Sequence, residues 1–151
     1  MDLQGWMRRA LAEAALAAES GEVPVGAVLV WQNQIIAADH NHTEHSEKPL
    51  EHAEMRVLAA ATGRLSQAQW RESTLFVSLE PCPMCMGALM HCHLGRVVFA
   101  ANNLKWGACG SVCDFLGLFP AQPMEVLGGI CEAEAQAQLA DFFKTLRASR
   151  V

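Results

Sequence analysis

The sequence predicts an α/β fold of three layers, in which a five-stranded mixed sheet carries helices on both of its faces. Three observations lead to this prediction. An amphipathic opening segment precedes two short strand-like segments, strands and helices then alternate, and a second amphipathic segment closes the chain. Alternating strands and helices form sheets that are covered by helices on both faces. At 151 residues the chain has the length of one domain, so we expect a single domain over residues 1–151.

The first third of the chain predicts a helix followed by a hairpin. Residues 3–19 place Met7, Leu11, Ala14 and other apolar residues at helical spacing, which is typical of an amphipathic helix. Residues 23–31 are rich in valine, and residues 35–38 form a second apolar run after a short turn. A short connection between two strands predicts an antiparallel hairpin. The polar stretch 40–51 contains three histidines, but their spacing fits no rigid element, so we expect a solvated loop.

The remaining two thirds predict alternating helices and strands. The expected helices cover residues 52–62, 83–93 and 133–148, and the expected strands cover residues 74–79, 96–101 and 124–127. The strands of the segments 74–101 and 96–127 should be parallel and joined by right-handed crossovers. The helix starts at residues 52 and 83 would then lie together beyond the strand ends, where open α/β sheets bind their ligands.

Composition and charge exclude several classes of protein. With 52% hydrophobic and 18% charged residues, the sequence is that of a globular domain and not of a disordered chain. The net charge of -5 argues against a general nucleic-acid-binding surface but permits a local basic patch. No apolar run approaches the roughly 18 residues of a membrane span. The first residues lack the layout of a signal peptide, so we expect a cytoplasmic protein with reduced thiols and no membrane partner.

Two cysteines at the start of the 83–93 helix form half of a predicted metal site. Cys82 and Cys85 are three residues apart and lie on one face of the first helical turn. The positive end of a helix lowers a thiol pKa and favours the thiolate that zinc requires. His52 adds a third ligand, and three protein ligands leave one zinc position open for water, as in catalytic sites. A Cys-x-x-Cys pair alone is also compatible with a redox pair or a structural zinc site.

Glu54 distinguishes these possibilities, because it stands two residues after His52 and has no use in a structural site. Zinc lowers the pKa of bound water to about 7, and a neighbouring carboxylate can move protons to a ring nitrogen and a leaving amine. The pattern His-x-Glu followed by Pro-Cys-x-x-Cys is the known signature of zinc-dependent nucleobase deaminases. The pattern therefore predicts a catalytic zinc site with Glu54 as the proton shuttle.

Over nearly its whole length the chain resembles the bacterial tRNA-specific adenosine deaminases, which have the cytidine-deaminase-like fold. The similar segments are residues 21–30, 52–54, 79–82, 85–88, 95–99 and 105–111. The resemblance implies one zinc ion per subunit on His52, Cys82 and Cys85, and a zinc-bound water as the nucleophile. It also implies hydrolytic deamination of adenosine to inosine at the wobble position of tRNA, with the anticodon stem-loop as partner. Two subunits of a homodimer would form the RNA-binding surface.

The resemblance also names residues that would contact the substrate: Asn41, Val25, Asn103 and Lys105. Asn41 matches an asparagine that holds the target base, and an amide both donates and accepts hydrogen bonds. Asn103 stands where the family has an aspartate that meets the target ribose, and Lys-Pro-Leu-Glu at residues 48–51 replaces Asp-Pro-Thr-Ala. These departures concern substrate recognition and not zinc. Deamination of a free nucleobase or nucleoside of the guanine or cytosine type is the alternative, and a non-catalytic zinc-stabilised module is a third hypothesis.

Overall fold

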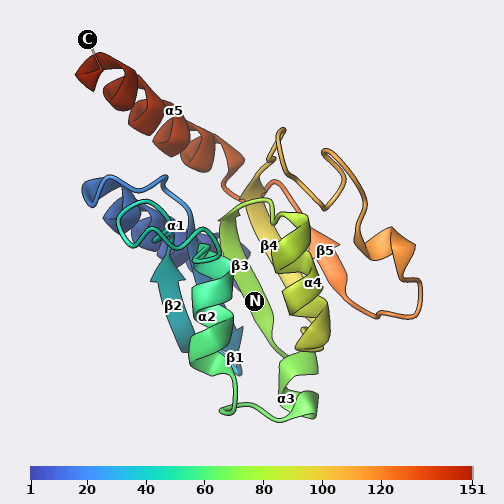
Figure 1. The fold of residues 1–151 in the computed structure, drawn as a ribbon. Coiled ribbons are helices and arrows are strands. Elements are labelled where there is room, and N and C mark those ends of the chain that lie inside the picture. The colour runs from blue at the N-terminus through green and yellow to red at the C-terminus, as the bar shows by residue number, and fades with distance from the viewer. Residues whose placement is uncertain (151) are drawn as a thin grey trace.

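A computed structural model describes residues 1–150 of the chain (Figure 1). Its elements in chain order are α1 (Leu3–Glu19), β1 (Gly26–Trp31), β2 (Gln34–His40), α2 (Ala53–Ala61), α3 (Gln67–Arg71), β3 (Thr74–Leu79), α4 (Pro83–His91), β4 (Arg96–Ala101), the 3₁₀ helix η1 (Leu116–Leu118), β5 (Glu125–Leu127) and α5 (Glu132–Ser149). Within residues 1–150, no helix combines the length and the apolar character that a membrane crossing requires.

The strands form the predicted five-stranded mixed sheet, in the order β2-β1-β3-β4-β5. Strand β1 pairs antiparallel with both β2 and β3, while β3 with β4 and β4 with β5 are parallel. The parallel arrangement of residues 74–101 and 96–127 is therefore confirmed. The β4–β5 connection contains only η1 as helical structure between the two strands, in a segment interrupted by Gly107, Gly110 and Gly117.

The sheet has a separate apolar core on each face, as the three-layer prediction requires. Alternate residues of a strand point to opposite faces. Leu29, Val77 and their neighbours pack with α2 and α4, whereas Val28, Phe76 and their neighbours pack with α1 and the start of α5. Figure 1 shows α2 and α4 side by side on one face, with α5 extending beyond the sheet. The three-layer α/β/α fold is confirmed.

The start of β1 and the presence of α3 differ from the prediction based on the sequence. Strand β1 begins at Gly26, because Pro24 has no N–H for a ladder and the Val25 N–H donates to the Val23 carbonyl at 2.8 Å. Helix α3 was not predicted, since its five residues are too few to show helical periodicity. A capping box between Ser66 and Gln69 stabilises α3, and Trp70 anchors it in the core with 6% of its surface exposed.

Candidate active site

His52 and Cys82 occupy equivalent places in the fold, because each is the N-cap residue of a helix on the same face of the sheet. His52 precedes α2 and Cys82 precedes α4, both with extended backbone and without a side-chain capping bond. Pro83 follows Cys82 at the first helical position, where its missing N–H costs nothing. Cys85 lies one turn into α4 and is fully buried. Both helix starts therefore aim their cap side chains at one point, as the sequence predicted.

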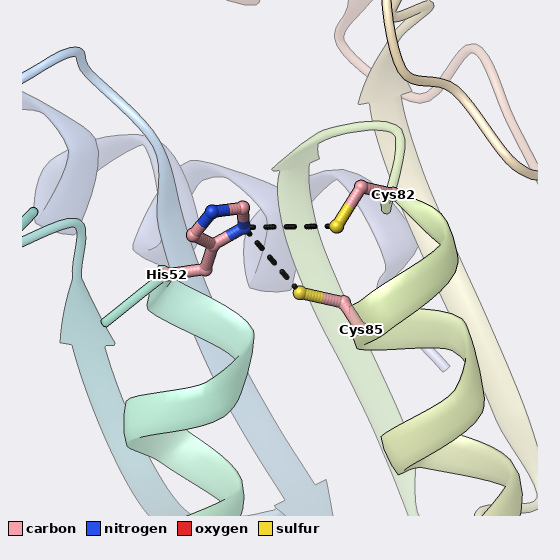
Figure 2. A group of neighbouring side chains, drawn as sticks. All are labelled: His52, Cys82 and Cys85. Atoms are coloured by element: carbon pink, nitrogen blue, oxygen red, sulfur yellow. Dashed lines mark hydrogen bonds between the residues drawn. The ribbon is translucent and has the colours of Figure 1, made fainter. Parts of the chain in front are cut away.

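The side chains of His52, Cys82 and Cys85 converge in Figure 2. His52 Nδ1 lies 3.7 Å from Cys82 Sγ and 3.6 Å from Cys85 Sγ. Ligands of a tetrahedral zinc ion with Zn–N of about 2.0–2.1 Å and Zn–S of about 2.3 Å would be about 3.6 Å apart. The donor types and their spacing therefore fit zinc, and the set provides three protein ligands.

The ionisation of the two thiols is linked through their mutual hydrogen bond. This bond lowers the pKa of Cys82 to about 4, and the His52 imidazole acts in the same direction. The same bond and burial raise the pKa of Cys85. The hydrogen bond with Cys82 raises the pKa of His52. One thiolate thus forms readily in the cluster, and a bound cation would favour the second.

Glu54 lies in the first turn of α2, only two residues after His52, and is 3% exposed. Burial raises the pKa of its carboxyl group above the ordinary value for glutamate. Its side chain nevertheless lines the pocket in front of the cluster. A buried carboxyl group that reaches the pocket beside His52 and Cys82 is suited to exchanging protons with a bound molecule.

A pocket of about 810 Å³ opens in front of the cluster, and its wall is mostly apolar. All four predicted substrate contacts line this pocket: Val25, Asn41, Asn103 and Lys105. Val25 lies just before β1, and Asn41 lies just after β2. The N–H of Asn41 donates to the Val25 carbonyl at 3.0 Å, and Asn41 is 8% exposed. The hairpin thus places these two residues side by side at the pocket.

The loop between β2 and α2 forms one wall of the pocket and is held by two carboxylates. Glu22, 2% exposed, accepts hydrogen bonds from the N–H groups of Glu44 and His45. Asp39 at the end of β2 bonds to Arg56 of α2 at 2.7 Å and to the His42 ring at 3.1 Å. These contacts fix the first half of the polar stretch 40–51, for which the sequence predicted a loop. They also connect β2 to α2, and so position Asn41 relative to His52.

The loop after β4 forms a second wall, and the buried carboxylate of Glu80 supports it. Glu80, 1% exposed, accepts from the N–H groups of Asn103 (3.1 Å), Cys109 (2.8 Å) and Ser111 (3.2 Å), and from the Ser111 hydroxyl. A Cβ at Gly107 would stand 2.6 Å from the Glu80 side chain, so this close approach requires glycine. No role was predicted for Glu80 from the sequence, although an acidic residue directly after an apolar strand is a visible signal.

Several apolar residues of the pocket were also missed, including residues from the loop after β4 and from α5. Trp106 comes from the loop after β4, and Leu139 and Phe143 come from α5. The sequence predicted an amphipathic helix here but no site role for these two residues, and Phe143 is 40% exposed. No local pattern shows that α5 reaches this end of the sheet. Residues of α5 reach the pocket because β5, the strand before this helix, lies at the edge of the sheet beside β4.

The fold and this site define a class of protein, since a buried carboxylate beside a His/Cys/Cys cluster at helix starts is the arrangement of nucleobase deaminases. The chain belongs to the family of MafB19-like deaminases, whose model matches residues 1–147. It is therefore an enzyme of a hydrolytic deaminase family.

Comparison with individual known proteins shows which deaminases the chain is similar to. The tRNA-specific adenosine deaminase of Bacillus subtilis (strain 168) is 42% identical over 144 residues, which are 94% of this chain and 89% of that enzyme. A solved structure of a tRNA:A34 deaminase, studied for A-to-I editing at the wobble position of transfer RNA, superimposes with a TM-score of 0.79. It is 34% identical and covers 89% of this chain and 99% of its own. A guanine deaminase from Nitrosomonas europaea shares the fold at 21% identity, with a TM-score of 0.74 over 92% of this chain and 83% of its own.

Proposed function

We propose that this enzyme deaminates adenosine to inosine at the wobble position of tRNA, with the anticodon stem-loop as its substrate. The observation that carries the proposal is the convergence of His52, Cys82 and Cys85 beside the buried Glu54 in a large open pocket. Relatives that are similar over almost the whole chain, and not only at the metal motif, act on tRNA adenosine.

In this proposal the three ligands hold one zinc ion per subunit. Zinc held there would lower the pKa of a water molecule to about 7 and so supply a nucleophile at neutral pH. The Glu54 carboxylate takes the proton that the water gives up. It passes protons to the ring nitrogen beside the reacting carbon and then to the departing amine. Adenosine and one water thus yield inosine and ammonia, and Glu54 returns to its carboxylate form.

The pocket residues orient the purine for this reaction. The Asn41 amide can donate to and accept from the edge of the base, and its burial makes such hydrogen bonds strong. Val25 offers an apolar surface to one side of the ring, since it lies beside Asn41 in the wall. Asn103 and Lys105 occupy the outer loop, where the ribose and phosphate of a bound nucleotide would lie.

The proposal includes a single catalytic domain over residues 1–151, a homodimer and a cytoplasmic location. Large apolar side chains are exposed on the segment that follows the second pocket wall: Val112, Leu118 and Phe119. Phe115 of this segment lies against Gly87 of α4, so α4 and the segment form a continuous surface. Exposed apolar surface of this kind is typical of subunit interfaces. Sedimentation of the zinc-loaded protein would distinguish the proposed dimer from a monomer.

The substrate is tested by incubating the zinc-loaded protein with an anticodon stem-loop that carries adenosine at the wobble position. Free adenosine, adenine, guanine, cytidine and cytosine form the comparison panel, and mass spectrometry measures deamination. We expect turnover of the stem-loop, with a kcat/KM that falls steeply between roughly 50 and 300 mM salt because phosphate contacts release counterions. Turnover of guanine or a cytosine compound without turnover of the stem-loop would refute the proposal and favour a small-molecule deaminase.

A further inference from the structure

Trp106 is a large aromatic residue that lines the pocket while 59% of its surface remains exposed. Leu104, two residues earlier, also lines the pocket and is 84% exposed. Burying a large aromatic side chain is strongly favourable, so an indole left open at a binding site is suited to burial by a ligand. Figure 1 shows the loop after β4 at the same end of the sheet as the start of α5.

The backbone beneath Trp106 is ordered independently of the indole. The Asn103 side-chain oxygen accepts from the N–H groups of Lys105 at 3.2 Å and Trp106 at 3.0 Å. The Gly107 N–H donates to the Asn103 carbonyl at 2.8 Å, and Glu80 holds the Asn103 N–H from below. A loop held by four hydrogen bonds presents its side chains in a fixed arrangement. An aromatic surface that is positioned before binding costs little entropy when a ligand covers it.

The dimensions and charge of this region favour a nucleic-acid strand as the ligand. The pocket volume of about 810 Å³ is near the upper end of the range of about 300–1,000 Å³ for small-molecule sites. Glu54 and the metal ligands lie at the starts of α2 and α4, whereas Trp106 comes from the loop after β4, so the pocket is lined by separate regions that two neighbouring bases of a strand could occupy. Lys105 places a positive charge next to Trp106. An aromatic surface beside a cation is the combination that binds single-stranded nucleic acid.

We propose that Trp106 is a stacking platform for the nucleobase that neighbours the target adenosine in the RNA strand, and that Lys105 supplies positive charge for the strand's phosphate. This inference rests on the proposed function and names a residue that contributes to strand recognition. Trp106 takes no part in proton transfer. It binds a part of the substrate that free adenosine does not have.

The test compares the wild-type enzyme with Trp106→Ala, Trp106→Phe and the control Trp31→Ala. Trp31 ends β1 at the opposite end of the strand from Val25, and it does not line the pocket. Each zinc-loaded protein is assayed on the intact stem-loop and on stem-loops with an abasic residue immediately 5′ or 3′ of the target. Stacking of one base is worth about 1–3 kcal/mol, which corresponds to about 5- to 150-fold in kcat/KM.

We expect Trp106→Ala to lose activity on the intact stem-loop by this factor, mainly through KM, while Trp106→Phe and Trp31→Ala retain most of it. On the stem-loop that lacks the stacked base, wild type and Trp106→Ala should have equal kcat/KM, since the contact is already absent. Equal activity of both proteins on the intact stem-loop would overturn the inference and leave the proposed function standing. An equal loss on all three stem-loops would also overturn it. No turnover by the wild type would refute the proposed function itself.

Discussion

Replacing Glu80 tests how much the loop after β4, which forms one wall of the pocket, depends on a buried carboxylate that takes no part in the proposed reaction. Replacing Glu80 by alanine removes the acceptor for three backbone N–H groups and one hydroxyl group of the loop after β4. The donors of Asn103 and Cys109 belong to half-buried residues, and Ser111 is exposed. We therefore expect the Ser111 hydroxyl to turn to water, while the three N–H groups lose a charged partner.

The magnitude follows from these three bonds. A net loss of about 1–2 kcal/mol for each N–H group gives about 3–6 kcal/mol in the free energy of unfolding. The total free energy of unfolding of a domain is about 5–15 kcal/mol, so this loss would remove a large fraction of the stability. The melting temperature should fall by roughly 6–24 °C, since about 2–4 °C corresponds to 1 kcal/mol at this chain length. Glu80→Gln should cost about half as much, because its amide keeps one oxygen but turns an NH₂ group towards the other donors.

Thermal unfolding and amide hydrogen exchange measure the two parts of this prediction on zinc-loaded protein. Exchange should accelerate first at Asn103, Cys109 and Ser111, and the core of β3 should keep its protection. Glu19→Ala, at the exposed end of α1, is the control and should stay within about 0.5 kcal/mol of wild type. A Glu80→Ala protein that melts within about 2 °C of wild type, with these three amides still protected, would refute the assigned role.

Three further predictions concern the chemistry, the metal and the loop before α2. Glu54→Gln should lower kcat on the stem-loop by about 10²- to 10⁴-fold while zinc content and melting temperature stay the same, because the amide cannot accept a proton. Cys82→Ala should lose stoichiometric zinc in elemental analysis after gel filtration, since only two protein ligands remain. For Asp39, burial acts to raise the pKa, but bonds from the His40 backbone, Arg56 and His42 lower it overall. Its stabilisation is therefore present above the unfolded pKa of about 3.9 and is lost as pH falls through the lower folded value. The urea midpoints of wild type and Asp39→Asn should differ most near neutral pH and converge in acid.

Each of these predictions has an outcome that contradicts it. Substantial turnover by Glu54→Gln would mean that another group moves the proton. Cys82→Ala that retains one zinc per chain would remove Cys82 from the ligand set. A constant difference between the urea midpoints of wild type and Asp39→Asn from neutral pH down to about pH 3 would show that the Asp39 charge contributes nothing to stability.

Local spacing determined the parts of the site that lie on single elements. Cys82 and Cys85 share a helical turn because residues three apart lie on one face, and Pro83 marks the helix start. His52 and Glu54 are likewise placed by the start of α2. The alternation of apolar strands and amphipathic helices was enough to predict the three layers. All of these signals depend on neighbours within a few residues, so the sequence alone contains them.

Only the tertiary structure decided what comes together from distant parts of the chain. His52 meets the two cysteines because the order β1-β3-β4 sets α2 and α4 side by side, and the spacing of residues in the sequence does not specify strand order. Glu80 acquires its role because the loop after β4 folds back over it. In the sequence, Trp106 and Phe143 cannot be distinguished from ordinary apolar residues. Their exposure at the pocket depends on the directions in which the loop after β4 and helix α5 leave the sheet. Exposure and partners over long separations depend on packing of the whole chain, which local periodicity does not encode.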